Sequence, residues 1–314
     1  MLTNITDNTN SIFETDLWLN CVAENSWERI EIKNNNGIVD ASFPIYKTQK
    51  MGCKLLTVPP LTQTLGIYLR DTGAKLTKKM EREKKLIIKI IDTLPEGYNY
   101  DFFLDIDNEY SLPFIWKGFK LEPHFSYRLE NLSDLDYIWN GFKENIKTDI
   151  RKAQKQVEVI RSSDIESLIR IQEKTFERQK RRLPYDKNII RKINNVMQDN
   201  NKNIYLCAVD SKGNIHAAAY FVFDHRRCYY LLGGGDPLYR NSGASSLLLW
   251  EGIKYSTTCS KVFDFEGSMI EPIEKFIRGF GARPRVYYRA RKMNLLLETL
   301  DSIKPKAKKI LGYK

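Results

Sequence analysis

The spacing of apolar and polar residues predicts the same series of strands and helices twice along the chain. Trp27 to Lys33 alternates apolar and polar residues, Asn34 to Gly37 has turn chemistry, and Ile38 to Thr48 resumes the alternation, which is typical of a hairpin. A third strand stops at Pro59-Pro60, and Lys75 to Leu94 has helical periodicity. A strand, a short helix and a strand are then expected at Tyr98 to Asp105, Leu112 to Phe119 and His124 to Glu130.

The second half is expected to repeat this order after a helical stretch. Helices are predicted at Ser133 to Gln156, with a break at Gly141, at Asp164 to Gln179 and at Lys187 to Gln198. A hairpin follows at Asn203 to Asp210 and Ile215 to Asp224, then a strand at Cys228 to Leu232 and a glycine-rich turn at Gly233 to Gly235. After the turn we expect a helix at Ser246 to Ile253, a strand at Val262 to Ser268, a short helix at Glu271 to Arg278 and a strand at Arg283 to Arg291. A last helix is expected at Asn294 to Ser302.

Two sequence segments support an internal duplication. Lys117 to Arg128 reads KGFKLEPHFSYR and Arg278 to Arg289 reads RGFGARPRVYYR, so the offset is 278 − 117 = 161. At this offset Phe102 falls on Phe263 and Asp105 on Glu266. Chance similarity is the alternative. The fold class expected is α/β with a mixed sheet, in two tandem domains over residues 1–130 and 131–314.

The glycine-rich turn occurs only in the second copy. Gly233, Gly234 and Gly235 follow an apolar strand and precede a helix, and the unpaired N–H groups and dipole at a helix start favour an anion. The first copy has Thr62 to Gly66 there instead. The first domain is therefore expected to be degenerate, and the second to hold the site. A plain turn is the alternative interpretation of the glycines.

Composition narrows the kind of partner and the compartment. The net charge of +11 suggests an acidic partner such as phosphates, RNA or an anionic membrane surface, although a merely basic protein is the alternative. Five scattered cysteines favour reduced thiols, and three histidines without ligand spacing predict no metal site. With no signal peptide and no apolar run of membrane-spanning length, a cytoplasmic protein is expected, and peripheral membrane contact stays open.

The turn after the third strand of the second copy carries a family resemblance. Arg240 to Ser245 resembles the R-x-x-G-x-[GA] turn of GNAT acyltransferases, except that Ser245 replaces the final Gly or Ala. The tandem arrangement looks like the Fem-type peptidyltransferases and related acyltransferases of bacterial polysaccharide and cell-envelope gene clusters. The segments that carry this resemblance are Ile150 to Lys155, Phe263 to Ser268 and Phe276 to Ala282. Fem-type enzymes commonly have a lysine where Ile277 stands, and this departure favours acetyl-CoA or another acyl-CoA over aminoacyl-tRNA as the donor.

The resemblance implies direct attack of an amine on a thioester. The N–H groups near Arg240, Gly243, Ala244 and Ser245 would hold the donor's pyrophosphate, with Arg240 adding charge. A backbone N–H near Leu232 or Gly233 would receive the developing oxyanion, and Gly234 and Gly235 complete the expected donor site.

Two carboxylates and a tyrosine are the catalytic candidates. Asp264 and Glu266 are two apart on a predicted strand and would share one face, so that one raises the pKa of the other. Glu266 would be the base, Asp264 its partner, and Tyr230 the acid for the leaving thiolate. The alternative is that both carboxylates are solvated or paired with Arg289 or Arg291.

The acceptor is less constrained. The residues predicted to line the acceptor cleft are Lys152, Arg178, Gln179 and Tyr185. The alternative is that they form a solvated basic face. The acceptor would be a small molecule or a sugar, such as an amino sugar of a cell-surface polysaccharide. A tRNA-dependent transferase on a peptidoglycan precursor, a non-catalytic binding module and O-acylation stay open.

Overall fold

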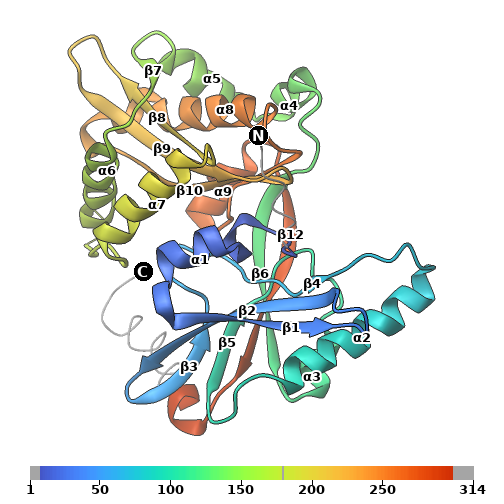
Figure 1. The fold of residues 1–314 in the computed structure, drawn as a ribbon. Coiled ribbons are helices and arrows are strands. Elements are labelled where there is room, and N and C mark those ends of the chain that lie inside the picture. The colour runs from blue at the N-terminus through green and yellow to red at the C-terminus, as the bar shows by residue number, and fades with distance from the viewer. Residues whose placement is uncertain (1–7, 179, 300–314) are drawn as a thin grey trace. The chain divides into compact units, whose positions relative to one another are not determined.

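A computed structural model describes residues 8–178 and 180–299, which form two compact units (Figure 1). Within the described residues, the first unit comprises 8–10, 25–123 and 287–299, and the second comprises 11–24 and 124–286. The predicted division between residues 130 and 131 does not separate these units, because the chain passes between them several times. The end of the helix expected at 294–302 lies outside the described residues.

The first repeat has the element order expected from its sequence. Its hairpin, third strand, helix, strand, short helix and last strand are β1 (Trp27–Lys33), β2 (Val39–Lys50), β3 (Cys53–Thr57), α2 (Leu76–Asp92), β5 (Asn99–Phe103), α3 (Leu112–Trp116) and β6 (Lys120–Leu129). A two-residue strand, β4 (Tyr68–Leu69), pairs with β2. The buried residues of α2 lie in its second half, where the helix packs on β1 and β2.

The second repeat has the same order. Its elements are β8 (Asn203–Val209), β9 (Ile215–Phe223), β10 (Arg227–Gly235), the 3-10 helix η3 (Pro237–Ser242), α8 (Ala244–Ser256), β11 (Val262–Asp264), α9 (Glu271–Arg278) and β12 (Arg283–Lys292). Before it come α4 (Leu135–Gly141), α5 (Glu144–Ala153), β7 (Glu158–Arg161), α6 (Ile165–Arg178) and α7 (Lys187–Asp199). At the N-terminus, η1 (Ile12–Glu14), α1 (Asp16–Val22) and η2 (Glu24–Ser26) were not predicted.

The last strands of the two repeats are exchanged. β11 pairs with β6, with Phe263 opposite Leu129, and β5 pairs with β12, with Phe102 opposite Ala290. The offset between these pairs is 263 − 102 = 161 on one side and 290 − 129 = 161 on the other. The register of pairing therefore repeats with the sequence, which confirms the tandem fold. Strand order is β1-β2-β3-β5-β12 in the first unit and β6-β11-β10-β9-β8-β7 in the second.

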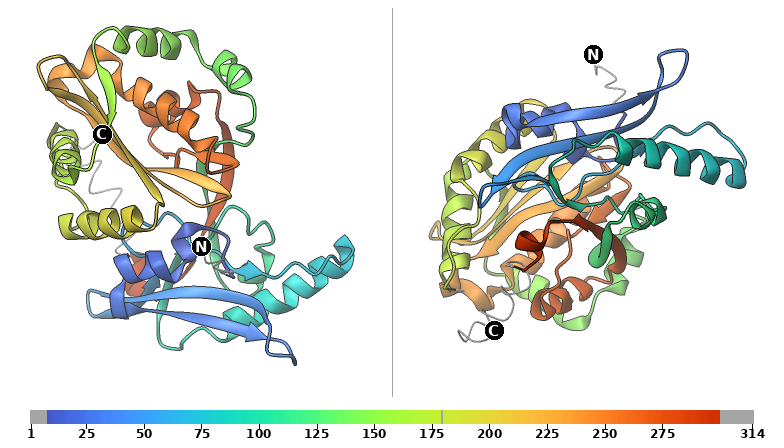
Figure 2. Two further views of the ribbon diagram at one scale, coloured as in Figure 1. Left: turned by 45° about the horizontal axis from the view of Figure 1, so that its top comes forward. Right: turned by 90° about the horizontal axis from the view of Figure 1, so that it is seen from below.

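Alternating side chains give the second unit's sheet two covered faces. On β9, Ala217, Ala219 and Phe221 belong to the apolar core that also contains buried residues of α5 and α8. The opposite face is covered by α6 and α7, where Ser167 of α6 hydrogen-bonds the Tyr205 hydroxyl at 2.5 Å. Figures 1 and 2 show these helix pairs on opposite sides of β8, β9 and β10. A sheet covered on both faces leaves its strand edges and strand ends as the places where a ligand can meet backbone groups.

Candidate functional site

Strands β10 and β11 part after Tyr229. Their parallel pairing covers only Arg227 to Tyr229 opposite Val262 to Asp264, whereas β10 stays paired with β9 as far as Gly235. No strand among the described residues pairs with the other edge of 230–235. Asp236 N–H donates to the His216 carbonyl of β9 at 2.9 Å, so by alternation Gly233 and Gly235 direct their N–H groups away from β9. The second unit thus has an open backbone edge at this point.

A cavity of about 810 Å³ lies between this edge and the start of α8. Nine of the residues singled out from the sequence line it, namely Lys152, Arg178, Tyr230, Gly234, Gly235, Arg240, Gly243, Ala244 and Ser245. Leu232, Gly233, Asp264, Glu266 and Tyr185 are not among the lining residues, and Gln179 lies outside the described residues. The structure therefore places most of the predicted donor-binding residues around one space.

The start of α8 is fixed by Gly243. This residue has φ +78°, and a Cβ there would lie 2.2 Å from the carbonyl oxygen of Asp149 on α5, so a side chain is excluded. Lys152 of α5 donates to the Asn241 carbonyl at 2.5 Å. Lys152, Arg178 and Arg240 are exposed at the cavity. The helix N-terminus and these cations give the cavity a positive character suited to phosphate.

Gly233 to Gly235, predicted to form a turn, instead form the end of strand β10, where they make room for protein side chains. A Cβ at Gly233 would lie 2.0 Å from the Tyr230 hydroxyl, and one at Gly234 would lie 2.4 Å from the Thr175 hydroxyl of α6. The close approach that three consecutive glycines predicted is thus made by Tyr230 and α6.

Helix α6 also holds the open edge in place. Gln172, which is buried, donates from Nε2 to the Gly233 carbonyl at 2.7 Å, and the Tyr185 hydroxyl donates to Gln172 Oε1 at 3.0 Å. Sequence reasoning missed Gln172, although an amide on the buried face of an amphipathic helix is a recognisable signal. Burial raises the pKa of Tyr230 to about 12, so its hydroxyl keeps its proton at neutral pH.

Asp264 and Glu266 do not share one face of a strand, which corrects the prediction. β11 ends at Asp264, and Glu266 lies beyond it with φ +55°. Asp264 is fully buried and accepts from Arg128 Nε at 2.7 Å, from Ser126 Oγ at 2.5 Å and from the Glu266 N–H at 2.8 Å. A Cβ at Gly267 would lie 2.3 Å from the Phe125 carbonyl oxygen, so the turn that presents Glu266 is tightly packed.

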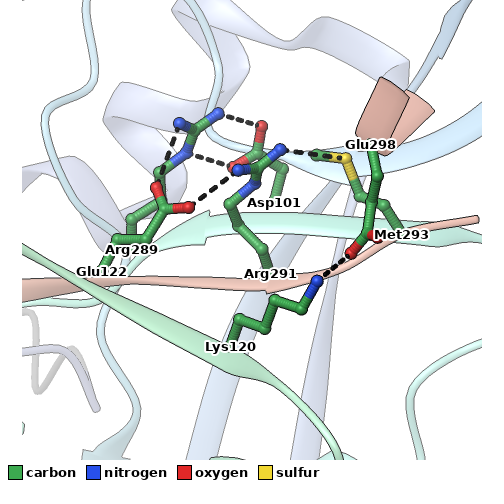
Figure 3. A network of polar contacts seen from close by, with 7 residues as sticks. All are labelled: Asp101, Lys120, Glu122, Arg289, Arg291, Met293 and Glu298. Atoms are coloured by element: carbon green, nitrogen blue, oxygen red, sulfur yellow. Dashed lines mark hydrogen bonds and ion pairs between the residues drawn. The ribbon is translucent and has the colours of Figure 1, made fainter. Parts of the chain in front are cut away.

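The two carboxyl groups have different electrostatic environments. Burial raises the pKa of Glu266 well above its usual range, and the nearby charge of Asp264 acts in the same direction. The predicted alternative pairing with Arg289 or Arg291 is not seen for Asp264, whose partner is Arg128. In the first unit, Arg289 instead binds Asp101 at 2.6 and 2.8 Å, and Arg291 binds Glu122 at 2.8 Å (Figure 3).

The first repeat fills the corresponding position with its own chain. β3 stops at Thr57 before Pro59-Pro60, and the following loop returns so that the Leu65 N–H donates to the Phe103 carbonyl at 2.8 Å. Leu65, fully buried, forms a parallel bridge with Leu104, and the Thr64 hydroxyl donates to Asp105 Oδ2 at 3.1 Å. In the first repeat, Leu65 therefore pairs with the chain just beyond the end of β5. In the second repeat, the corresponding stretch of β10 has an open edge, because β11 pairs with β10 only as far as Asp264.

Comparison with known proteins identifies similar domains and folds. Residues 140–265 match the family model of the acetyltransferase (GNAT) domain, and no curated protein matches the chain. A crystal structure of FemX is 14% identical over 89% of this chain and 92% of that chain, with a TM-score of 0.67. The C-terminal domain of a putative lysylphosphatidylglycerol synthetase from Agrobacterium fabrum is 9% identical over 95% and 92%, with a TM-score of 0.57. Both structures are similar to this chain in fold, across both units.

A third solved structure, a conserved protein of unknown function from Bacteroides thetaiotaomicron, is 13% identical over 91% of this chain and 94% of that chain, with a TM-score of 0.58. Within residues 8–178 and 180–299, no helix combines the length and apolar character needed to span a bilayer. In the same part of the chain, no three His, Cys, Asp or Glu side chains gather in a group that could bind a metal ion.

Proposed function

We propose that the chain is an acyltransferase that transfers an acyl group from acyl-CoA to an amino group, since residues 140–265 match the family model of the acetyltransferase (GNAT) domain. The observation that carries this proposal is the open edge of β10 beside the N-terminus of α8, within one cavity of about 810 Å³. An extended pantetheine arm matches an open strand edge, and a diphosphate matches a helix start.

Binding of the donor would use backbone more than side chains. The diphosphate would lie at the N–H groups of Gly243, Ala244 and Ser245, with Arg240 and Lys152 adding charge. The thioester carbonyl would then lie along the open edge, where the Gly233 and Gly235 N–H groups point away from β9. An N–H that is already fixed in direction stabilises a developing oxyanion without reorganisation.

Proton transfer would involve Glu266 and Tyr230. The amine must lose a proton, and a buried carboxylate whose pKa is raised above its usual range binds that proton more strongly than an ordinary carboxylate. The nitrogen then forms a bond to the thioester carbon, the C–S bond breaks, and the thiolate takes a proton from the Tyr230 hydroxyl. Asp264 would act indirectly, since it holds the Glu266 backbone and Arg128.

The acceptor we propose is an amino sugar of a cell-surface polysaccharide, in a cytoplasmic step. Arg178 and Lys152 are exposed at the cavity and suit an anionic or nucleotide-linked sugar. The test is release of free thiol from acetyl-CoA with nucleotide-linked amino sugars and with their hydroxyl analogues. Release that requires the amine supports the proposal, and release with the hydroxyl analogue alone would point to O-acylation.

A second candidate is a Fem-type transfer from aminoacyl-tRNA to a peptidoglycan precursor. The likeness to FemX across both units favours it, and the cations at the cavity are also suited to RNA phosphates. Incubation with labelled aminoacyl-tRNA and a peptidoglycan precursor distinguishes the two donors, since label would reach the acceptor only in the second case. A non-catalytic module would give turnover with neither donor.

A further inference from the structure

His216, at the start of β9, is a buried imidazole that the proposed chemistry does not use. Its side chain is 6% exposed, and it lies in the wall of the cavity of about 810 Å³. Nδ1 is buried and has no hydrogen-bond partner among the described residues. A buried polar atom without a partner costs free energy, and because His216 belongs to the cavity wall, a ligand group in the cavity would relieve this cost.

The other ring nitrogen is held by a carboxylate. His216 Nε2 lies 3.3 Å from Asp210 Oδ2. Asp210 also accepts from the backbone N–H groups of Lys212 and Asn214, both at 2.9 Å, and from the Asn214 side chain at 2.9 Å. These hydrogen bonds, first of all those from Asn214, lower the pKa of Asp210 to about 2, so this anion persists near neutral pH.

The ring is also fixed in orientation. His216 stacks on Tyr239 of η3 with ring centroids 3.9 Å apart and an interplanar angle of 5°. Tyr239 and Arg240 line the same cavity, at the end where α8 begins. The imidazole therefore shares the cavity wall with Tyr239 and Arg240.

The charged groups around the ring come from three elements. Asp210 lies in the turn between β8 and β9, and Asp236, which precedes η3, pairs with Lys174 of α6 at 2.5 Å. Arg240 lines the cavity beside them. A phosphate placed there would set a second anion against the imidazole, opposite Asp210, and an imidazolium between two anions is favoured over a neutral ring.

We propose that His216 is a phosphate-binding residue that takes up a proton when a phosphate group enters the cavity. In the free protein Nε2–H donates to Asp210, and on binding Nδ1 gains a proton and donates to a phosphate oxygen. The inference rests on the proposed function only in that the donor carries a phosphate, which is true of both CoA and tRNA.

The experiment is calorimetric titration of the full chain with dephospho-CoA, whose diphosphate diester does not itself titrate near neutral pH. Titrations from pH 5.5 to 8.5, each in two buffers of different ionisation enthalpy, report proton uptake directly. We expect net uptake of up to one proton on binding, and an affinity that falls by up to about tenfold per pH unit as the pH rises. His216→Gln is expected to remove both effects and to leave affinity at pH 8.5 nearly unchanged.

Binding without proton uptake by the unaltered protein overturns the inference, and this measurement needs no variant to fold. Uptake that persists in a folded His216→Gln protein overturns it as well. A further outcome is that dephospho-CoA and CoA fail to bind while unacylated tRNA or inorganic pyrophosphate binds with proton uptake that depends on His216 and exceeds the titration of the ligand itself. In that case the inference stands and the proposal of an acyl-CoA donor is overturned. If none of these four ligands binds with such uptake, the inference is overturned.

Discussion

At the scale of single residues, Glu266 and Asp264 are chemically different although they are only two positions apart in the sequence. Asp264 is a buried anion with three hydrogen-bond donors, among them Arg128. Glu266 lies in the turn that follows, and burial raises the pKa of its carboxyl group. The first is suited to holding structure, and the second to accepting a proton.

Glu266→Gln is expected to lower kcat by about 10² to 10⁴-fold, as is typical for loss of a general base. It should also change how stability depends on pH. Because the folded-state pKa is raised, the carboxyl group stabilises the fold below its ordinary pKa of about 4.3 and loses this contribution as the pH rises through the raised value. Urea unfolding at several pH values should show this loss in the unaltered protein alone. An identical pH dependence in both proteins would contradict the assignment.

Asp264→Asn tests the structural role of the neighbouring carboxylate. Arg128 has 5% of its side chain exposed, and removing its anionic partner should cost about 3–5 kcal/mol of unfolding free energy. Denaturant unfolding measures this, with Glu271→Gln as a control because Glu271 is an exposed carboxylate at the start of α9. Full stability together with lost turnover would instead support the role expected from the sequence, in which Asp264 is the partner of the base Glu266.

At the scale of elements, α6 determines the geometry of the open edge of β10. Gln172 holds the Gly233 carbonyl, and Thr175 lies against Gly234. The edge is therefore fixed before any ligand binds.

Gln172→Leu should lower kcat and leave KM for the acyl donor nearly unchanged. The Gly233 carbonyl loses its hydrogen bond from Gln172, whereas the start of α8 is not affected. The loss of two buried hydrogen bonds should also cost about 1–3 kcal/mol of stability for each group left unpaired. Tyr185→Phe removes only the outer hydrogen bond and is the matched milder variant. An increase in KM with kcat intact would place Gln172 in donor binding instead.

Periodicity in the sequence predicted the elements well, because apolar spacing is a local property. The helix expected at Glu271 to Arg278 has these bounds in the structure, and Gly141 ends α4 as expected. The pairing of β11 with β6 was beyond such reasoning, since it joins residues more than 130 positions apart. Gln172 and His216 were missed because their roles come from tertiary contacts with β10 and with the Asp210 turn.

At the scale of the whole molecule, neither repeat supplies a complete sheet for its unit. β11 of the second repeat pairs with β6, which belongs to the first repeat, and β5 pairs with β12. The repeats therefore share strands, although among the described residues only the second repeat has the open edge and the three consecutive glycines at the end of β10.

Residues 131–314 produced alone should not fold cooperatively. The fragment lacks β6, so β11 loses its antiparallel partner and Asp264 loses Arg128. Thermal unfolding followed by near-ultraviolet circular dichroism should show no sharp transition, and co-production with residues 1–130 should restore one. A fragment that unfolds cooperatively at the temperature of the full chain would show that strand exchange is dispensable.

The central claim is that the cavity between the β10 edge and α8 holds acyl-CoA. Calorimetric titration of the full chain with acetyl-CoA tests it most directly, with Arg240→Ala as the site variant and Arg283→Ala as the control, because Arg283 is exposed outside the cavity. We predict saturable one-to-one binding, weakened about 10 to 100-fold by Arg240→Ala through loss of a charge-assisted contact and unchanged by Arg283→Ala. No binding at millimolar acetyl-CoA, or equal binding by all three proteins, would contradict the claim.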